Sequence, residues 1–291
     1  MHQPTGHGYP RQSPLRVLAA LLLAAGGLRA GEPAVQVGNT DFCLVDKTTA
    51  LPNAMVKEND LRRVQPFVQA LPDGCRVRVE FATFGAGGDN RPIRYVCLLT
   101  PLNPENQIDG VELAFSDWYQ APVRQSPFRK GVKDGTEKLG TPTGVPQAEV
   151  PWVAGQLHGV KKTYHPNGKL ATEAAYEKNV IAGETRAYSP EGQLLRVTPF
   201  KKGKRDGDMI DYWPGRDQVV ERVVPYRNGQ VEGLSKGFYA DGKVKWERPF
   251  HKNEMHGIER QYAPDGKIER ERHWLNGEAV SADQFKATFK E

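Results

Sequence analysis

The apolar residues of the C-terminal half recur with a near-constant period. An aromatic residue returns after steps of 24, 24, 24, 26, 24 and 24 residues, at Phe128, Trp152, Tyr176, Phe200, Tyr226, Phe250 and Trp274. A period of this size is typical of arrays in which small supersecondary units stack on their neighbours. The pattern therefore predicts a repeat array of about six units over residues 126–280.

A second aromatic residue and a glycine divide each period into two strands. The aromatic stands twelve residues after the first, at Tyr164, Tyr188, Tyr212, Phe238 and Tyr262. Four residues later four of the units have a glycine in a turn sequence such as Pro-Asn-Gly or Ala-Asp-Gly, at Gly168, Gly192, Gly242 and Gly266. The unit that contains Tyr212 has a loop two residues longer, and the first unit has Gly140 at the aromatic position.

Two further positions exclude large side chains. Three residues after the first aromatic the chain has only Gly or Asn, which enter the left-handed region of backbone space at low cost. Seven residues after it the chain has glycine alone, at Gly135, Gly159, Gly183, Gly207, Gly233 and Gly257. We therefore expect a turn with positive φ at the first position, and a close approach of another backbone segment or an extreme backbone conformation at the second.

These positions predict a mainly β fold with one hairpin per unit, for example with strands at residues 160–164 and 169–176. We expect the aromatic and aliphatic residues of both strands to form one apolar stripe, with the charged residues on the opposite face. Proline often precedes the first aromatic, and because it lacks a donor it is expected at a strand end or a bulge. Residues 281–291 predict a capping helix in which Ser281 and Gln284 form a capping box and Phe285 and Phe289 share a face.

Residues 1–30 have the three-part layout of a secretory signal. Arg11 and Arg16 precede an apolar run at residues 17–25, and small residues follow as far as Ala30. The run is too short to cross a bilayer as a helix. We therefore expect cleavage near Ala30 and an exported protein, either periplasmic or secreted.

Residues 31–125 predict a small β region that contains all three cysteines. Period-two alternation predicts a half-buried strand at residues 75–81, and a second strand is expected at 93–99, ended by Pro101 and Pro104. A helix capped by Asp60 is expected at residues 60–70, and a third strand at 111–119. In an oxidising compartment two of the cysteines can pair, and the sequence does not choose among Cys43, Cys75 and Cys97.

The charge of the chain argues against a nucleic-acid partner. The formal net charge is +5, from 40 basic and 35 acidic residues, but residues 1–30 hold three arginines and no acid. The rest of the chain is close to neutral, with both signs interspersed, whereas nucleic-acid-binding proteins carry a concentrated basic surface.

The unit aromatic-x-x-Gly/Asn-x-x-x-Gly-x-x-x-x-Tyr-x-x-x-Gly resembles the MORN-repeat variant found in the YwqK-type antitoxin family. Residues 176–192 show it in full, and the resemblance covers residues 128–280. It implies an elongated, twisted sheet of β-hairpins that binds another protein, and the family label implies that this protein is a toxin.

No chemical motif stands out from the repeat. His158 and His256 share one repeat position that elsewhere holds Asp, Glu or Ala, which indicates a solvated turn, so we expect no metal site there or at the nearby His165 and His251. Acidic residues recur at many equivalent positions, so no catalytic pair is singled out. We expect no cofactor and no catalytic residue.

The expected function is that of an exported, non-catalytic scaffold that binds another protein, with an antitoxin-like or immunity-like role. Aromatic residues away from a buried stripe would form the binding surface, and the candidates are Tyr188, Trp213, Tyr239 and Trp246. The alternative is a peripheral membrane or envelope protein held by a basic face that contains Lys161, Lys162, Lys201, Lys202 and Lys204. A hydrolase with its site in residues 31–125 has the least support.

Overall fold

A computed structural model describes residues 35–37, 40–48, 58–86, 92–116 and 121–288. The protein is mainly β, as the sequence predicts. The chain divides into two compact units between Leu99 and Thr100, and each is described by itself below. The predicted signal segment at residues 1–30 lies outside the described residues.

The first unit is a small antiparallel sheet with one helix. It contains β1 (Val35–Val37), β2 (Thr40–Val45), α1 (Glu58–Gln69), β3 (Arg76–Ala86) and β4 (Pro92–Leu102), whose last residues belong to the second unit. Strand β2 pairs with β1 and β3. Val77, Val79 and Phe81 of β3 are buried, which confirms the alternation predicted for this strand.

Two boundaries predicted for this region are wrong. Helix α1 begins at Glu58, so Asp60 lies inside its first turn instead of capping it; acidic residues suit both positions, because both lie near the positive end of the helix dipole. Strand β4 continues through Pro101 to Leu102. Pro101 is tolerated there because its carbonyl is the group that is used, as the acceptor of the Asp109 backbone N–H at 3.1 Å.

No disulfide joins any of the three cysteines, all of which lie in the described part of the chain, so the structure gives no support to the predicted disulfide. Cys43 is buried opposite Val79. The Cys97 thiol donates to the Glu80 carbonyl at 3.4 Å, and burial together with the negative charge of Glu80 raises the pKa of Cys97 to about 11. Cys97 is therefore protonated at neutral pH, as befits a packing residue and not a nucleophile.

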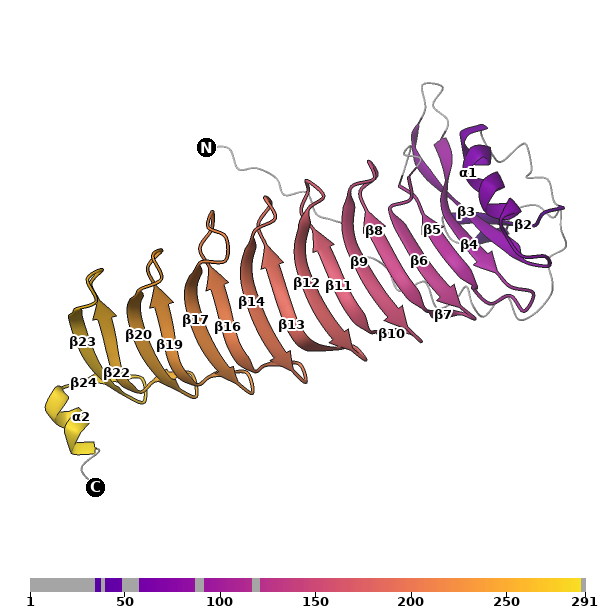
Figure 1. Ribbon diagram of the computed structural model, residues 1–291. Coiled ribbons are helices and arrows are strands. Elements are labelled where there is room, and N and C mark those ends of the chain that lie inside the picture. The colour runs from indigo at the N-terminus through magenta and orange to yellow at the C-terminus, as the bar shows by residue number, and fades with distance from the viewer. Residues whose placement is uncertain (1–34, 38–39, 49–57, 87–91, 117–120, 289–291) are drawn as a thin grey trace, which may run out of the picture. The chain divides into compact units, whose positions relative to one another are not determined.

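The second unit is one continuous antiparallel sheet whose hairpins follow one another in chain order (Figure 1). Its elements are β5 (Gly110–Ala114), β6 (Arg124–Arg129), β7 (Val132–Lys133), β8 (Gly135–Gly140), β9 (Pro146–Val153), β10 (Gln156–Leu157), β11 (Gly159–Tyr164), β12 (Leu170–Glu177), β13 (Val180–Tyr188), β14 (Leu194–Lys201), β15 (Lys204–Arg205), β16 (Gly207–Tyr212), β17 (Val220–Arg227), β18 (Gln230–Val231), β19 (Gly233–Phe238), β20 (Val244–His251), β21 (Glu254–Met255), β22 (Gly257–Tyr262), β23 (Ile268–Leu275), β24 (Glu278–Val280) and α2 (Ala282–Thr288). The predicted strands at 160–164 and 169–176 agree with β11 and β12 to within one residue.

The Gly/Asn position is a tight-turn residue, as predicted. All seven residues at this position have φ between 68° and 89°, and the residue before each also has positive φ, near 50°. Two successive positive φ values are those of a type I′ turn, whose twist matches that of paired strands. The first of the two residues is Lys at four of the seven turns, a residue type that does not signal this conformation, so the sequence did not reveal it.

The all-glycine position has the positive φ expected of an unusual backbone conformation, but its near neighbour is a side chain and not the predicted backbone. Gly207 has φ 113°, and a Cβ atom there would lie 3.0 Å from Cγ of Pro199. Gly257 and Pro249 repeat this arrangement at 2.9 Å. At four of the six glycines a Cβ atom would lie 2.9 to 3.2 Å from the proline before the first aromatic, whereas the distance is 3.5 Å from Gly233 to Pro225 and 3.7 Å from Gly183 to Ala175.

That proline also faces a break in the sheet. Strand β14 pairs with β15 at Phe200 and Lys201 and with β16 at Arg196 and Val197, so Pro199 lies where the ladder is interrupted. Its missing N–H is therefore not needed, which agrees with the predicted bulge. A second irregularity, immediately before Tyr212 and its equivalents in the other hairpins, was not predicted.

The prediction of a single apolar stripe is wrong, because the two aromatic positions lie on opposite faces. Residues that pair across a strand ladder share a face, and Trp152 pairs with Leu157 across the two-residue turn. For two strands joined by such a turn, the residue numbers of two side chains on the same face, one from each strand, differ by an odd number. The second aromatic follows the first by twelve, so Tyr164 lies on the face opposite Trp152.

Helix α2 closes the last hairpin with the predicted capping box. The Ser281 backbone N–H donates to Oε1 of Gln284 at 2.9 Å, and the Gln284 N–H donates to Oγ of Ser281 at 3.2 Å. The ring of Phe285 packs 5.1 Å from that of His273 of β23. Phe289, expected on the same face, lies outside the described residues.

Candidate functional site

The second unit has two faces of different composition. We call the face that carries Trp152, Tyr176, Phe200, Tyr226, Phe250 and Trp274 the arginine face, and the face that carries Pro127, Pro151, Pro199, Pro225 and Pro249 the proline face. The assignment follows from the strand registers, in which Gly207 pairs with Tyr226 and Asp208 with Pro225.

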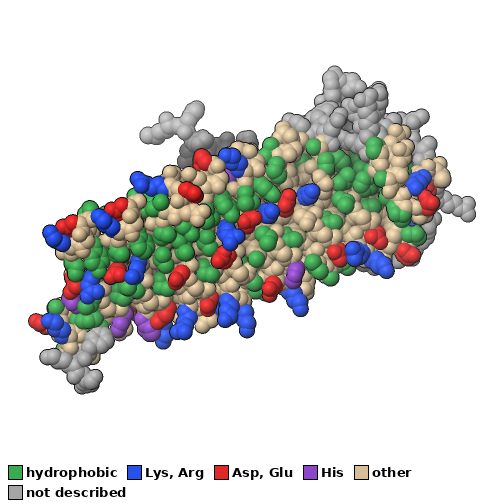
Figure 2. All heavy atoms as spheres, viewed as in Figure 1, with side chains coloured by type: hydrophobic (Ala, Val, Ile, Leu, Met, Phe, Trp, Pro, Cys, Tyr) green, Lys and Arg blue, Asp and Glu red, His purple; other side chains and the backbone are tan. Residues whose placement is uncertain are grey.

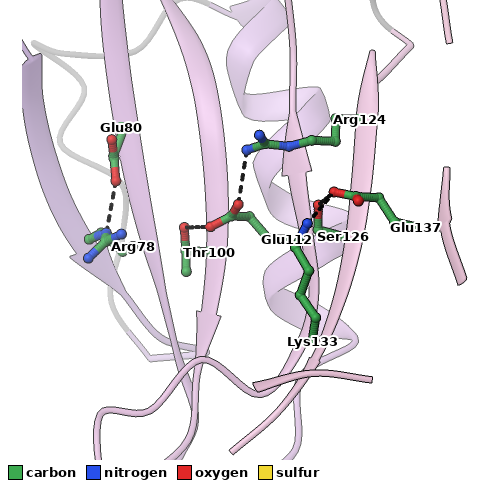
Figure 3. Close-up of polar contacts among 8 residues, drawn as sticks. All are labelled: Arg78, Glu80, Thr100, Glu112, Arg124, Ser126, Lys133 and Glu137. Atoms are coloured by element: carbon green, nitrogen blue, oxygen red, sulfur yellow. Dashed lines mark hydrogen bonds and ion pairs between the residues drawn. The ribbon is translucent and has the colours of Figure 1, made fainter. Parts of the chain in front are cut away.

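Buried carboxylates bind several partners on the arginine face. Glu137 of β8 is 6% exposed and accepts hydrogen bonds from Ser126 Oγ at 2.7 Å, Lys133 Nζ at 2.7 Å and Trp152 Nε1 at 3.1 Å. Figure 3 shows the first two of these side chains converging on Glu137 from neighbouring strands. Burial opposes ionisation of Glu137, but these donors and the Lys133 charge hold its pKa below the ordinary value, so it is an anchored anion at neutral pH.

The same arrangement occurs one hairpin earlier. Glu112 of β5 is buried and accepts from Thr100 Oγ1 at 3.0 Å and from Arg124 at 3.2 Å (Figure 3). A buried charge is tolerated only when donors surround it, which is the condition met here. At the N-terminal end of this face the buried carboxylates are therefore paired with basic side chains of the protein itself.

Farther along, one carboxylate serves two arginines. Asp211 of β16 is 5% exposed and lies between Arg196 of β14 and Arg222 of β17, both of which donate to it. Burial disfavours the charged carboxylate, but the hydrogen bonds and charges of the two guanidinium groups hold the Asp211 pKa below its ordinary value. The two arginine side chains remain 49% and 42% exposed. Because one carboxylate cannot pair all the donors of two guanidinium groups, this cluster keeps a positive charge toward solvent.

In the last hairpins a carboxylate again binds an arginine, and a tryptophan donates to the same carboxylate. Arg248 donates to Oε1 of Glu259 at 2.8 Å, and Trp274 donates to Oε2 of the same carboxylate at 3.1 Å. The Arg248 guanidinium also lies 4.6 Å from the ring centre of Trp246. Trp246 in turn covers Gly237, where a Cβ atom would be 2.2 Å from the indole, so the glycine makes room for the ring.

The C-terminal part of the arginine face is consequently cationic. Among the described strand residues from Arg196 onward whose register assigns them to this face, Arg196, Arg205, Arg222, Arg248, Arg270 and Arg272 stand against Asp211 and Glu259. Glu221, at the bulge of β17, also acts electrostatically on Arg196. Arg205 lies 5.1 Å above the Tyr226 ring and donates to its hydroxyl. Arg270 and Arg272 are exposed and have no carboxylate partner among the residues described.

The proline face is neutralised across its strands. Lys162 faces Glu173, Lys236 faces Glu247 and Arg260 faces Glu271, each within 4.0 Å. Two of these glutamates also accept hydrogen bonds from tyrosines at the second aromatic position. The Tyr188 hydroxyl donates to Glu173 at 3.0 Å, and the Tyr262 hydroxyl donates to Glu247 at 2.8 Å. In the hairpins that have Tyr212 and Phe238 at the second aromatic position, the glutamate is replaced by Val197 and Val223, respectively.

The four predicted binding residues do not form one cluster. Tyr188 lies on the proline face and Trp246 on the arginine face. Tyr239 is held at a hairpin end by the bond from its hydroxyl to the Tyr262 carbonyl at 2.7 Å. Trp213 begins the longer loop, and its buried Nε1 has no hydrogen-bond partner among the described residues. All four are partly exposed, so their binding role stays a prediction.

The lysines of the alternative basic face are dispersed over both faces and the turns. Lys162 is paired with Glu173, whereas Lys201 and Lys204 are exposed and face each other across a turn. Basic side chains gather along the turn border, at the lower edge of Figure 2, and hydrophobic ones form a band through the strands. Neither helix in the described part of the chain has the length and apolar composition needed to cross a membrane.

The histidines hold neighbouring repeats together. His165 Nε2 lies 2.9 Å from the Tyr188 carbonyl, and His251 Nδ1 lies 2.9 Å from Glu232. His256 contacts Asn276 at 3.1 Å, and His158 is exposed. Within the described ranges no three His, Cys, Asp or Glu side chains gather as metal ligands do.

The anchored arginines leave no recognisable pattern in the sequence, whereas the hydrogen bonds of the two tryptophans do. Each of the two tryptophans in the first aromatic position has a glutamate fifteen residues earlier, Glu137 before Trp152 and Glu259 before Trp274. The phenylalanines at this position, Phe200 and Phe250, have Thr185 and Ser235 there instead. Pairing of the indole N–H with a carboxylate could have been inferred from this spacing.

Comparison with known proteins places two hairpins in a described repeat class. Residues 157–178 and 255–276 match the MORN repeat variant. The expected repeat class is thereby confirmed for these segments, while no relative confirms the resemblance to YwqK-type antitoxins. No curated protein matches the chain. Among solved structures, a porin-like protein from Bacteroides uniformis ATCC 8492 is similar at 6% identity over 72% of this chain and 89% of that chain; its TM-score of 0.18 carries no argument.

Proposed function

We propose that the protein is a non-catalytic scaffold whose MORN-variant array binds another protein through the arginine face. MORN repeats generally take part in protein or membrane interactions. The observation that supports a protein partner is the Arg196–Asp211–Arg222 cluster beside Tyr226 and Trp246. Arginine and large aromatic residues are the side chains that carry most of the energy of protein interfaces.

The anchoring of these side chains favours a fixed binding surface. Arg196 and Arg222 share the buried Asp211, and Arg248 is held between Glu259 and Trp246. Side chains already ordered in the free protein lose less entropy on binding, which increases affinity. We further propose that the protein acts outside the cytoplasm, as the layout of residues 1–30 suggests, and that neutralising an exported toxin is one form this binding could take.

Site-specific photocrosslinking tests the proposed function. A photoreactive residue is placed at Tyr226 on the arginine face or at Pro225 on the proline face, and the full chain is expressed in the cells that make it. We expect a discrete protein adduct from position 226 and little from position 225. Equal adducts from both faces, or none from either in any fraction, would contradict the proposal.

Binding to a membrane surface is the alternative outcome, supported by the lysines at the turns. Lys130, Lys178, Lys202 and Lys252 occupy equivalent turn positions and are exposed. Lysines near an anionic membrane each contribute about 1 kcal/mol of attraction. Flotation with phosphatidylserine vesicles at low and high salt distinguishes the two, because only membrane binding through these lysines predicts salt-sensitive flotation.

A further inference from the structure

We propose that the C-terminal part of the arginine face, from Arg196 to Arg272, binds an extended acidic segment of the partner protein. The proposal rests on the function proposed above and adds the chemistry of the partner. Six arginines against Asp211, Glu259 and the nearby Glu221 leave this part of the face with excess positive charge, whereas the proline face behind it pairs several of its charges across strands. Charge complementarity therefore favours an acidic partner on one face only.

One row of residues crosses seven strands of this face in register. Arg196 pairs with Asp211, Asp211 with Arg222, Arg222 with Gly237, Gly237 with Trp246, Trp246 with Gln261 and Gln261 with Arg270. Every second member is a large side chain, so the row presents two arginines, a tryptophan and a third arginine. The members between them are the buried Asp211, Gly237, which has no side chain, and the exposed Gln261.

The spacing of this row matches that of an extended chain. Neighbouring strands lie about 4.8 Å apart, so successive large side chains are about 10 Å apart. A peptide in the extended polyproline II conformation rises about 3.1 Å per residue with three residues per turn, so every third residue faces the same side, about 9 Å farther on. A segment lying across the strands would place a carboxylate on Arg196, Arg222 and Arg270 if acidic residues stood at its first, fourth and tenth positions. The seventh residue would lie on Trp246 and would be apolar.

The arginines are prepared for this role by the groups that hold them. Asp211 fixes Arg196 and Arg222 through one side of each guanidinium group, and the remaining N–H groups are available to a carboxylate from solvent. Bidentate Arg–carboxylate bonds are both strong and directional. The absence of a side chain at Gly237 lets the Trp246 ring lie close against the sheet.

The test uses the full chain and two synthetic peptides of equal composition. The first has Glu at positions 1, 4 and 10 and Leu at position 7, with Gly and Ser elsewhere, over about twelve residues. The second has its Glu residues adjacent at one end. We expect the first to bind at least about fivefold more tightly in low salt, because only it meets all three arginines.

Two double variants with the same change in net charge locate the site. Arg270→Glu with Arg272→Glu reverses exposed residues of the arginine face, and Lys201→Glu with Lys204→Glu reverses exposed residues at a turn. None of the four has a partner whose loss would endanger folding, which circular dichroism confirms. We expect the arginine variant to weaken binding of the first peptide about tenfold and the lysine variant to change it less than about twofold.

The outcomes separate this inference from the proposed function. Equal binding of both peptides, or equal effects of both variants, would show attraction by net charge alone and overturn the inference. Crosslinking of a partner at position 226 that survives Arg270→Glu with Arg272→Glu would leave the proposed function intact and refute the acidic segment. Vesicle binding that the lysine variant abolishes, without peptide binding, would indicate a membrane instead.

Discussion

The two faces of the repeat sheet share every strand but differ in how they manage charge. On the proline face several cations meet a glutamate on the neighbouring strand, as Lys236 meets Glu247, and proline and glycine contacts recur in several hairpins. On the arginine face buried carboxylates anchor cations, and the cations exceed them toward the C-terminal end. The comparison indicates that one face maintains the repeat, while the other varies along the array and is available for a partner.

The largest expected loss of stability comes from a substitution that disturbs a contact with a proline of the proline face. Gly257→Ala would place a Cβ atom 2.9 Å from Pro249 at φ 122°, whereas Gly266→Ala, at φ 86°, meets nothing within 4 Å. We expect a loss of about 3 kcal/mol for the first and about 1 kcal/mol for the second, because the second has only backbone strain. Urea unfolding of the two variants measures the difference, and similar losses would show that the proline contact is unimportant.

The next prediction concerns an anchor of the arginine face. Asp211→Ala removes a buried carboxylate and leaves Arg196 and Arg222 near each other without it. We expect a loss of about 2 kcal/mol, which is less than for a fully buried pair because both arginines reach solvent. Asp208→Ala, in the same strand but exposed on the proline face, is the control, with an expected change below about 0.5 kcal/mol.

The pH dependence of stability should differ between the same two positions. The pKa of Asp211 is depressed in the folded protein, so its contribution is fully present above the unfolded value near 3.8 and is lost as the pH falls through the folded value. Denaturant unfolding of Asp211→Asn between pH 6 and pH 3 should therefore show a shallower loss of stability than the wild type, by about 1 kcal/mol over that range. Asp208→Asn should follow the wild-type curve, and a parallel shift of both variants would contradict the assignment.

The sequence predicted the parts of the fold that depend on backbone conformation. Glycine or asparagine at a positive-φ turn, and glycine beside proline, leave a direct trace in residue type, so the hairpins and turns could be located to within a residue or two. The assignment of faces failed because it treated both aromatic positions as one stripe. The two-residue turn reverses the parity of the alternation, and lysine at the first position of four of the seven turns gives no sign of such a turn.

The candidate site was harder to predict because it is built across strands. Asp211 is anchored by Arg196, fifteen residues before it, and by Arg222, eleven residues after it, and neither distance corresponds to a local motif. The arginines also occupy positions that hold Ala148 or Thr172 in earlier hairpins, so alignment of the repeats shows no common residue. Only the strand register brings these side chains together.

The smallest expected effect tests whether the glutamates of the proline face also stabilise its tyrosines. The Tyr188 hydroxyl donates to Glu173, and the pKa of Tyr188 is raised by burial and by that carboxylate, so the neutral phenol is favoured in the folded chain. Tyr212 has Val197 at the equivalent position and no carboxylate to bond. We expect Tyr188→Phe to cost about 1 kcal/mol in urea unfolding and Tyr212→Phe nearly nothing, since a hydroxyl is worth keeping only where an acceptor meets it. In the next hairpin Phe238 stands at the tyrosine position and Val223 at the glutamate position, as this explanation expects. Equal costs of the two substitutions would mean that the aromatic ring, and not the hydrogen bond to glutamate, accounts for the residue type at this position.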